Sequence, residues 1–93
     1  MAEEINKDEL MSLMAEKLVL LRTNLGMKQG ELASKVGISR QSLYEYENKK
    51  RPMTWNTFLA LLSVFREDKS TGDLLEHFGI YSLKLSKFLT SPE

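Results

Sequence analysis

Cysteine is absent from the 93 residues, so neither disulfide bonds nor thiolate metal sites are available to this chain. Long hydrophobic runs are also missing, because no apolar stretch approaches the roughly 20 residues that span a bilayer. The first ten residues, MAEEINKDEL, are acidic and do not resemble an export signal. We therefore expect a cytoplasmic protein without a membrane segment, folded as a single domain over residues 1–93.

Net charge is absent too, because 13 Lys and Arg balance 13 Asp and Glu. The charges are nevertheless unevenly distributed. Residues 1–16 contain one base and five acids, residues 17–51 contain eight bases and three acids, and residues 52–93 contain four bases and five acids. A basic middle segment is compatible with a polyanion partner, although such asymmetry also arises by chance in a short chain.

Apolar side chains recur at spacings of three and four along most of the sequence, which predicts an all-α fold. The first helix is expected over 7–25, with Asn6 as its N-terminal cap and Gly26 as a left-handed stop. A short second helix is expected over 29–36 and ends at Gly37.

Two further helices follow a serine and a threonine that are suited to capping. Ser39 is expected to cap a helix over 40–48 by accepting a hydrogen bond from the backbone N–H of residue 41 or 42. Asn48 is expected to adopt the left-handed conformation at the end of that helix. Thr54 is expected to cap a helix that extends to about Phe65, and the basic loop KKRP lies between the two helices.

The C-terminal part is less regular. The segment REDKSTG is interpreted as a polar break, followed by a fifth helix over 73–78 that ends at Gly79. The tail IYSLKLSKFL permits two structures, because its apolar residues fit both the alternation of a strand and the spacing of a helix. Ser82 is a suitable cap, so this C-terminal extension is predicted to be helical, with a strand as the alternative.

Several side chains with functional chemistry have a simpler interpretation. Trp55, Phe58 and Phe65 are expected in the core rather than on a platform that stacks nucleic-acid bases. His77 is the single histidine, and no patterned carboxylate accompanies it. We therefore expect no metal, no cofactor and no catalytic site, and the protein is not expected to be an enzyme.

The stretch from Ala33 to Tyr46 meets the geometric demands of a helix-turn-helix. Two short helices are joined by VGIS, and a side chain as small as Ala33 permits them to cross closely at a steep angle. Gly37 reaches positive φ without steric cost and lets the chain reverse. Ile38 is expected beneath the turn, while Leu43 and Tyr46 anchor the second of the two helices.

Residues 21–65 resemble the DNA-binding domain of the Cro/phage-repressor family of transcriptional regulators, also called the xenobiotic-response-element type. The resemblance depends on L-R before the second helix, Q-x-E-L-A, V-G-I-S, and a glutamate before a basic loop and an apolar helix. It implies a five-helix, lambda-repressor-like DNA-binding bundle. Its helix-turn-helix core is expected at 17–65, with an acidic extension of the first helix at 1–16 and a helix and tail at 66–93.

The resemblance implies that the 40–48 helix enters the major groove of double-stranded DNA and presents residues near its N-terminus to base edges. The residues implied to read bases are Arg40, Gln41, Tyr44 and Glu45. Arg binds guanine O6 and N7 together, and Gln binds adenine N6 and N7. Tyr44 is expected at a thymine methyl or at the sugar-phosphate backbone. Glu45 either accepts a hydrogen bond from cytosine N4 or repels phosphates.

A second group of residues is implied to bind DNA phosphates: Lys28, Gln29, Ser42, Lys49, Lys50 and Arg51. Gln29 lies at the start of a helix, where free backbone N–H groups also favour anions. Arg22 and Glu47 are implied to form a structural ion pair that ties the first helix to the end of the 40–48 helix. The sequence departs from the family pattern at Lys28, where a small polar cap is usual.

These features lead to the hypothesis of a sequence-specific, repressor-type transcriptional regulator that binds a pseudo-palindromic DNA site as a homodimer. The long first helix and the apolar tail at 80–89 are the candidate dimer surfaces, and the alternative for the tail is that it seals the core of the monomer. The alternative function is an antitoxin-like or adaptor module that binds a partner protein, for which the acidic N-terminal region is suited, with DNA binding as a secondary property.

Overall fold

The computed structural model describes residues 4–92. Within these residues the chain forms six helices joined by loops, and no strand occurs. Residues 1–3 and 93, which include Glu3 and Glu93 of the acidic ends, lie outside the described residues. The helices are α1 (Lys7–Asn24), α2 (Gln29–Val36), α3 (Arg40–Glu47), α4 (Trp55–Arg66), α5 (Lys69–His77) and α6 (Leu83–Thr90). The all-α prediction is confirmed. None of these helices combines the length and the apolar character that crossing a membrane requires.

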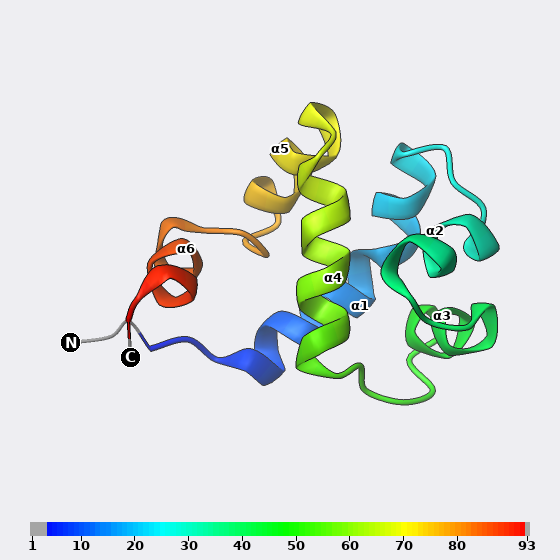
Figure 1. Cartoon of the computed structure of the whole chain (residues 1–93), viewed down its shortest axis with the longest axis horizontal. Coiled ribbons are helices and arrows are strands. Elements are labelled where there is room, and N and C mark those ends of the chain that lie inside the picture. Colours follow the sequence, from blue (N-terminus) through cyan, green and yellow to red (C-terminus); the bar gives the residue numbers. More distant parts are fainter. Residues whose placement is uncertain (1–3, 93) are drawn as a thin grey trace.

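The helix α4 runs through the middle of the molecule, with α2 and α3 on one side and α5 and α6 on the other, while α1 crosses behind it (Figure 1). Phe58 and Phe65 are fully buried, as expected, whereas Trp55 is partly exposed and stacks on Phe58 with ring centroids 4.7 Å apart. All six helices contribute to one core, and its helical members are Met14, Leu18, Leu21, Leu32, Ala33, Leu43, Tyr46, Phe58, Leu61, Leu62, Phe65, Leu75 and Leu85.

Side-chain caps begin four helices where the sequence indicates. Asn6, Ser39, Thr54 and Ser82 each accept a hydrogen bond from the backbone N–H three residues further along, at 3.0 or 3.1 Å. Each cap satisfies a donor that the helix itself leaves unpaired, and such a cap typically contributes about 1 kcal/mol to the free energy of unfolding. Local hydrogen-bonding chemistry therefore fixes where these helices start.

Two helix ends differ from the predictions. α1 ends one residue early, at Asn24, and α3 stops at Glu47. Asn48 has a φ of −98°, so the expectation that it is left-handed is wrong. Lys49 takes that conformation instead, with a φ of 55°. The backbone N–H groups of Lys49 and Lys50 donate to carbonyls in the last turn of α3 at 3.2 and 2.8 Å, which is the bonding pattern of a Schellman motif. The Asn48 side chain also donates to a carbonyl of that turn, at 2.9 Å.

The predicted start of the fifth helix is wrong, because α5 begins at Lys69 rather than at Asp73. Asp68 caps it by accepting from the backbone N–H of Thr71 at 2.9 Å. Thr71 is fully buried, and its hydroxyl accepts from the amide of Asn24 on α1 at 2.8 Å. Most of the polar segment interpreted as a break is therefore a helical turn, stabilised by polar contacts that apolar periodicity does not reveal.

The tail forms α6, so the helical prediction is confirmed and the strand alternative is wrong. Leu85 anchors this helix in the core, and the ring of Phe88 lies 5.6 Å from the ammonium nitrogen of Lys7, which also lies 5.2 Å from the ring of Trp55. α6 thus packs near the N-terminal end of α1, at the opposite end of the molecule from α3 (Figure 1). Leu83 remains 70% exposed.

Candidate nucleic-acid interface

The pair α2 and α3 forms a helix-turn-helix whose turn is closed by the backbone. Gly37 has a φ of 77°, and the N–H groups of Gly37 and Ile38 both donate to the carbonyl of Ala33. Ala33 is 1% exposed where the helices pack, and Leu43 and Tyr46 are buried on the inner side of α3. This packing leaves the other side of α3 at the edge of the molecule (Figure 1).

The four predicted base-reading residues lie on the accessible part of α3. Arg40 and Gln41 are exposed, and Tyr44 is 38% exposed. The Glu45 side chain is 30% exposed, and one of its carboxylate oxygens accepts from Gln41 Nε2 at 3.4 Å. The structure therefore brings Gln41 and Glu45 together.

Most of the predicted phosphate ligands fall into two clusters at the ends of the motif, whereas Ser42 lies within α3. Lys28 is exposed and precedes α2, where Glu31 supplies the cap that a lysine side chain cannot, by accepting from the Lys28 backbone N–H at 2.8 Å. Gln29 is half-buried at the first position of α2. Lys49 and Lys50 are exposed beyond the C-terminus of α3, so basic groups flank the accessible side of α3 along the chain.

Arg22 and Glu47 make a largely buried ion pair between α1 and α3. Arg22 Nε lies 2.6 Å from Glu47 Oε2, and Arg22 Nη2 lies 3.2 Å from Glu47 Oε1. The two side chains are 14% and 2% exposed. Two partners were not anticipated from the sequence: the carbonyl of Met27, which accepts from Arg22 Nη1 at 3.0 Å, and Gln29, which donates to Glu47 Oε1 at 2.8 Å. The network joins α1, α2 and α3.

Arg51 does not extend from the loop as an isolated side chain but lies along α3. Its Nε lies 2.7 Å from Glu45 Oε1, and its Nη2 donates to Ser42 Oγ at 2.7 Å. Its guanidinium carbon lies 4.8 Å from the ring centroid of Tyr46. Hydrogen bonds from Arg51, and then from Gln41, lower the pKa of Glu45 below its ordinary value of 4.5. Sequence reasoning missed this pair, because a spacing of six residues has no helical signature.

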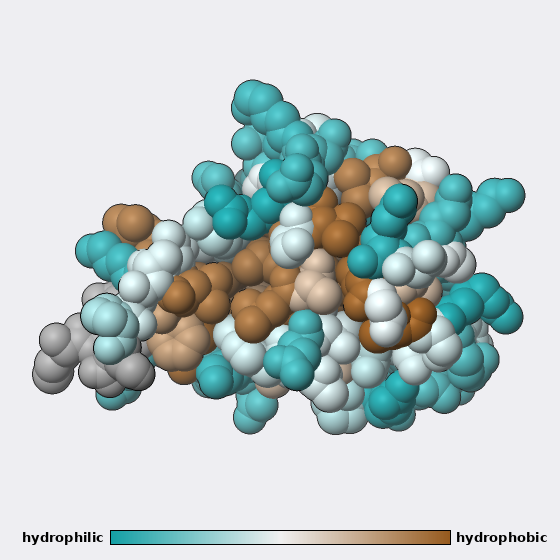
Figure 2. Space-filling view, viewed as in Figure 1, coloured by the Kyte–Doolittle hydropathy of each residue, from teal (hydrophilic) through white to brown (hydrophobic). Residues whose placement is uncertain are grey.

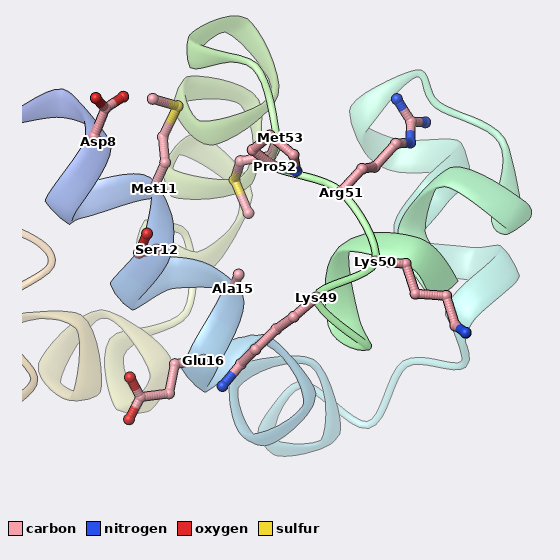
Figure 3. A pocket seen from close by; sticks show the side chains of 10 residues that line it. All are labelled: Asp8, Met11, Ser12, Ala15, Glu16, Lys49, Lys50, Arg51, Pro52 and Met53. Carbon is pink, nitrogen blue, oxygen red and sulfur yellow. The ribbon is translucent and has the colours of Figure 1, made fainter.

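A groove of about 550 Å³ separates the basic loop from the N-terminal half of α1. Met11 and Ala15 on α1 and Met53 after the loop supply apolar parts of its lining. In Figure 3, Asp8 and Glu16 project from α1 and the side chain of Lys49 extends toward α1, whereas the charged ends of Lys50 and Arg51 point away from α1. Asp8 and Glu16 therefore do not lie beside the charged ends of Lys50 and Arg51.

Hydrophobic and hydrophilic side chains are segregated on the surface. In Figure 2, apolar residues gather in a band from the middle of the visible face toward α6, whereas the end of the molecule that contains α3 is mainly hydrophilic. Within residues 4–92 no three His, Asp or Glu side chains gather in a way that would hold a metal ion. The chemistry available at the α3 end is hydrogen bonding and positive charge, which suits a polyanion.

A protein-family model described as helix-turn-helix matches residues 18–68. This span is more than half of the chain and includes the C-terminal part of α1 and all of α2, α3 and α4. No curated protein and no solved structure matches the chain.

Proposed function

Because the chain belongs to the Cro/repressor-type helix-turn-helix family of DNA-binding transcriptional regulators, we propose that it binds a specific double-stranded DNA sequence through α3. In this proposal it is a repressor that binds a pseudo-palindromic site as a homodimer. The observation that supports the proposal most directly is the combination of a buried inner side and an accessible polar side on α3. The cytoplasmic location remains a prediction.

Base recognition is assigned to the N-terminal half of α3, which would enter the major groove. Arg40 and Gln41 are exposed at the first two positions of the helix and suit guanine and adenine, respectively. Tyr44 lies one turn further and is positioned for a thymine methyl group or for the DNA backbone. Each bidentate contact is expected to discriminate by about 1–3 kcal/mol against the wrong base.

Phosphate binding is assigned to the basic residues on either side of α3. Lys28, Lys49 and Lys50 are exposed, and each phosphate that they neutralise is expected to add about 0.9 to the log–log salt slope. Gln29 uses one amide hydrogen for Glu47, which leaves the second for a phosphate at the start of α2. Contacts of this kind set affinity and orientation without reading sequence.

The dimer is proposed because one recognition helix reads few base pairs, whereas two helices about 34 Å apart add their discrimination. Leu83 and Leu89 on α6 are 70% and 40% exposed, which supports α6 as the dimer surface. Light scattering tests this point: Leu83→Lys combined with Leu89→Lys is expected to yield a folded monomer. A double variant that remains a dimer excludes α6 as the interface.

The second candidate, a module that binds a partner protein, is favoured by Val19 and Leu20 on α1. These adjacent apolar side chains are 46% and 48% exposed, and a contact surface for a protein partner would cover them. Competition between DNA and a candidate partner at high salt separates the two functions. A partner held by apolar contacts stays bound at high salt, whereas DNA is released.

The decisive experiment is a binding selection from random duplex DNA at fixed salt, with the wild type and with Arg40→Ala and Gln41→Ala. The wild type is expected to enrich one symmetric site, and each variant is expected to lose preference at particular positions while Lys28→Ala weakens all sites alike. No enriched site with the wild type, or variants with unchanged preferences, contradicts α3 as the reading element.

A further inference from the structure

The Glu45 carboxylate lies among the residues assigned to DNA recognition, where an unpaired negative charge would oppose DNA binding. Both of its oxygens are engaged: Oε1 by Arg51 at 2.7 Å and Oε2 by Gln41 at 3.4 Å. The hydrogen bond from Arg51 is the first cause that lowers the pKa of Glu45 below its ordinary value of 4.5. Glu45 therefore joins a predicted base reader to an arginine from outside the helix.

The backbone after α3 brings Arg51 back toward the helix. The left-handed Lys49, at a φ of 55°, reverses the chain, and the bond from the Lys50 N–H to the Glu45 carbonyl closes the turn at 2.8 Å. This geometry places Arg51 beside Glu45, in the last turn of α3, and beside Ser42, one turn earlier. Arg51 thus lies next to the recognition helix although six residues separate it from Glu45 in the sequence.

Three contacts then fix the orientation of the Arg51 side chain. Nε is held by Glu45, Nη2 by Ser42, and the guanidinium plane by the aromatic ring of Tyr46. Tyr46 is 3% exposed and belongs to the core, so the platform beneath Arg51 does not move freely. A side chain held in this way loses little rotamer freedom when it binds a ligand.

The guanidinium group keeps donors for a further ligand. Of its five N–H donors, the contacts within residues 4–92 use one on Nε and one on Nη2. Both hydrogens of Nη1 and the second hydrogen of Nη2 therefore remain. Two hydrogens on neighbouring nitrogens are the arrangement that grips guanine O6 and N7 together.

We infer that Arg51 reads a base edge in the major groove as part of the recognition surface, and that Glu45 is a positioning residue that holds it there. The inference rests on the proposed function and deepens it, because it changes two assignments. Arg51 becomes a specificity-determining residue rather than a phosphate ligand. Glu45 acts through Arg51 rather than by accepting from cytosine.

The test is the same random-duplex selection, performed with wild type, Arg51→Lys, Arg51→Ala and Glu45→Gln. Arg51→Lys keeps the charge but loses the planar fork, so it is expected to lower the preference at one base position of each half-site by about 5- to 150-fold. Glu45→Gln is expected to relax the same position by a smaller factor. The salt slope of Arg51→Lys is expected to equal that of the wild type.

Two control variants separate this effect from general losses. Arg66→Lys alters an arginine that also covers an aromatic ring, that of Tyr81 at 4.1 Å, but lies at the end of α4, so base preference is expected to stay unchanged. Lys50→Ala is expected to weaken all sequences alike. Circular dichroism and thermal melting of each variant establish that it is folded before selection.

Each other outcome overturns the inference. If Arg51→Lys keeps the wild-type preferences and Arg51→Ala weakens all sequences with a salt slope lower by about one, Arg51 is a phosphate ligand. If Glu45→Gln changes a position that Arg51→Lys leaves intact, Glu45 reads its own base. A wild type that enriches no site overturns the proposed function together with the inference, whereas the first two outcomes leave the proposed function standing.

Discussion

The helices α3 and α6 are built by the same local device and differ in what they present. Each has eight residues and begins at a serine cap that accepts from the N–H three residues further along, at 3.0 Å for Ser39 and 3.1 Å for Ser82. Each follows a left-handed glycine, Gly37 or Gly79, with φ values of 77° and 78°. The cap and the glycine therefore determine that a short helix forms but not what the helix does.

The difference lies in how the two helices are attached. α3 is held by Leu43 and Tyr46 and by the buried pair of Arg22 and Glu47. α6 is held mainly by Leu85 and carries two exposed leucines, Leu83 and Leu89. A surface that reads DNA bases requires rigid support, whereas a surface that covers a core or meets a second copy does not. Breaking each attachment in turn tests this contrast.

The largest effect is expected from Glu47→Ala, which leaves Arg22 and Gln29 without their shared acceptor. The free energy of unfolding is expected to fall by about 3–5 kcal/mol, because an uncompensated charge remains in a largely buried position. Urea denaturation followed by circular dichroism measures the change. Glu76→Ala, at an exposed glutamate of α5, is the control and is expected to stay within about 0.5 kcal/mol of the wild type. A cost for Glu47→Ala below about 1 kcal/mol would contradict the structural role of this pair.

Leu85→Ala is expected to have the next largest effect and to loosen α6. Its cost is expected to be about 2–3 kcal/mol, at the lower part of the range for a buried leucine, because α6 packs on few neighbours. Hydrogen exchange is expected to show reduced protection in α6 while α3 stays protected. Leu83→Ala, at a 70% exposed position, is the control. An equal loss of protection in α3 would show that the two helices do not differ in their attachment.

The serine caps provide a smaller and more symmetrical test. Ser39→Ala and Ser82→Ala are each expected to lower the free energy of unfolding by about 1 kcal/mol, which corresponds to a melting temperature lower by roughly 4–8 °C. Only Ser39→Ala is expected to weaken specific DNA binding as well, because the Ser39 hydroxyl also bonds to Ser42 at 3.0 Å. Equal losses of DNA affinity in the two variants would remove the functional distinction between α3 and α6.

Much of the fold followed from local signals. Asn6, Ser39, Thr54 and Ser82 marked four helix starts because a cap depends only on residues within one turn. The start of α5 was missed because a buried threonine bonded to Asn24 stabilises a segment without apolar periodicity. The left-handed residue after α3 was assigned one position early, since Asn tolerates that conformation better than Lys but its side chain here bonds back to the helix.

Less of the candidate site followed from the sequence. The accessible positions of Arg40 and Gln41 were predictable, because the apolar anchors of the helix leave those positions outside. The contacts of Gln29 with Glu47 and of Arg51 with Glu45 were not, since each joins residues whose distance depends on how three helices and a turn are packed. Side-chain networks of this kind are tertiary properties, and residue types alone do not specify them.

The smallest effect is expected at the cap of α5, where an aspartate replaces the serine of α3 and α6. Hydrogen bonds from the backbone N–H and the hydroxyl of Thr71 lower the pKa of Asp68 below its ordinary value of 3.8. A group whose pKa is lower in the folded than in the unfolded state stabilises the fold fully above its unfolded pKa, and that stabilisation is lost as the pH falls through the folded pKa. Asn also caps helices but does not titrate, so the stability advantage of wild type over Asp68→Asn is expected to shrink as the pH falls below 3.8.

Urea denaturation at several pH values measures this difference in the free energy of unfolding. The control is Ser39→Ala, which removes no charge, and its difference from wild type is expected to stay constant over the same pH range. A pH-independent difference for Asp68→Asn would show that the carboxylate charge contributes nothing to this cap.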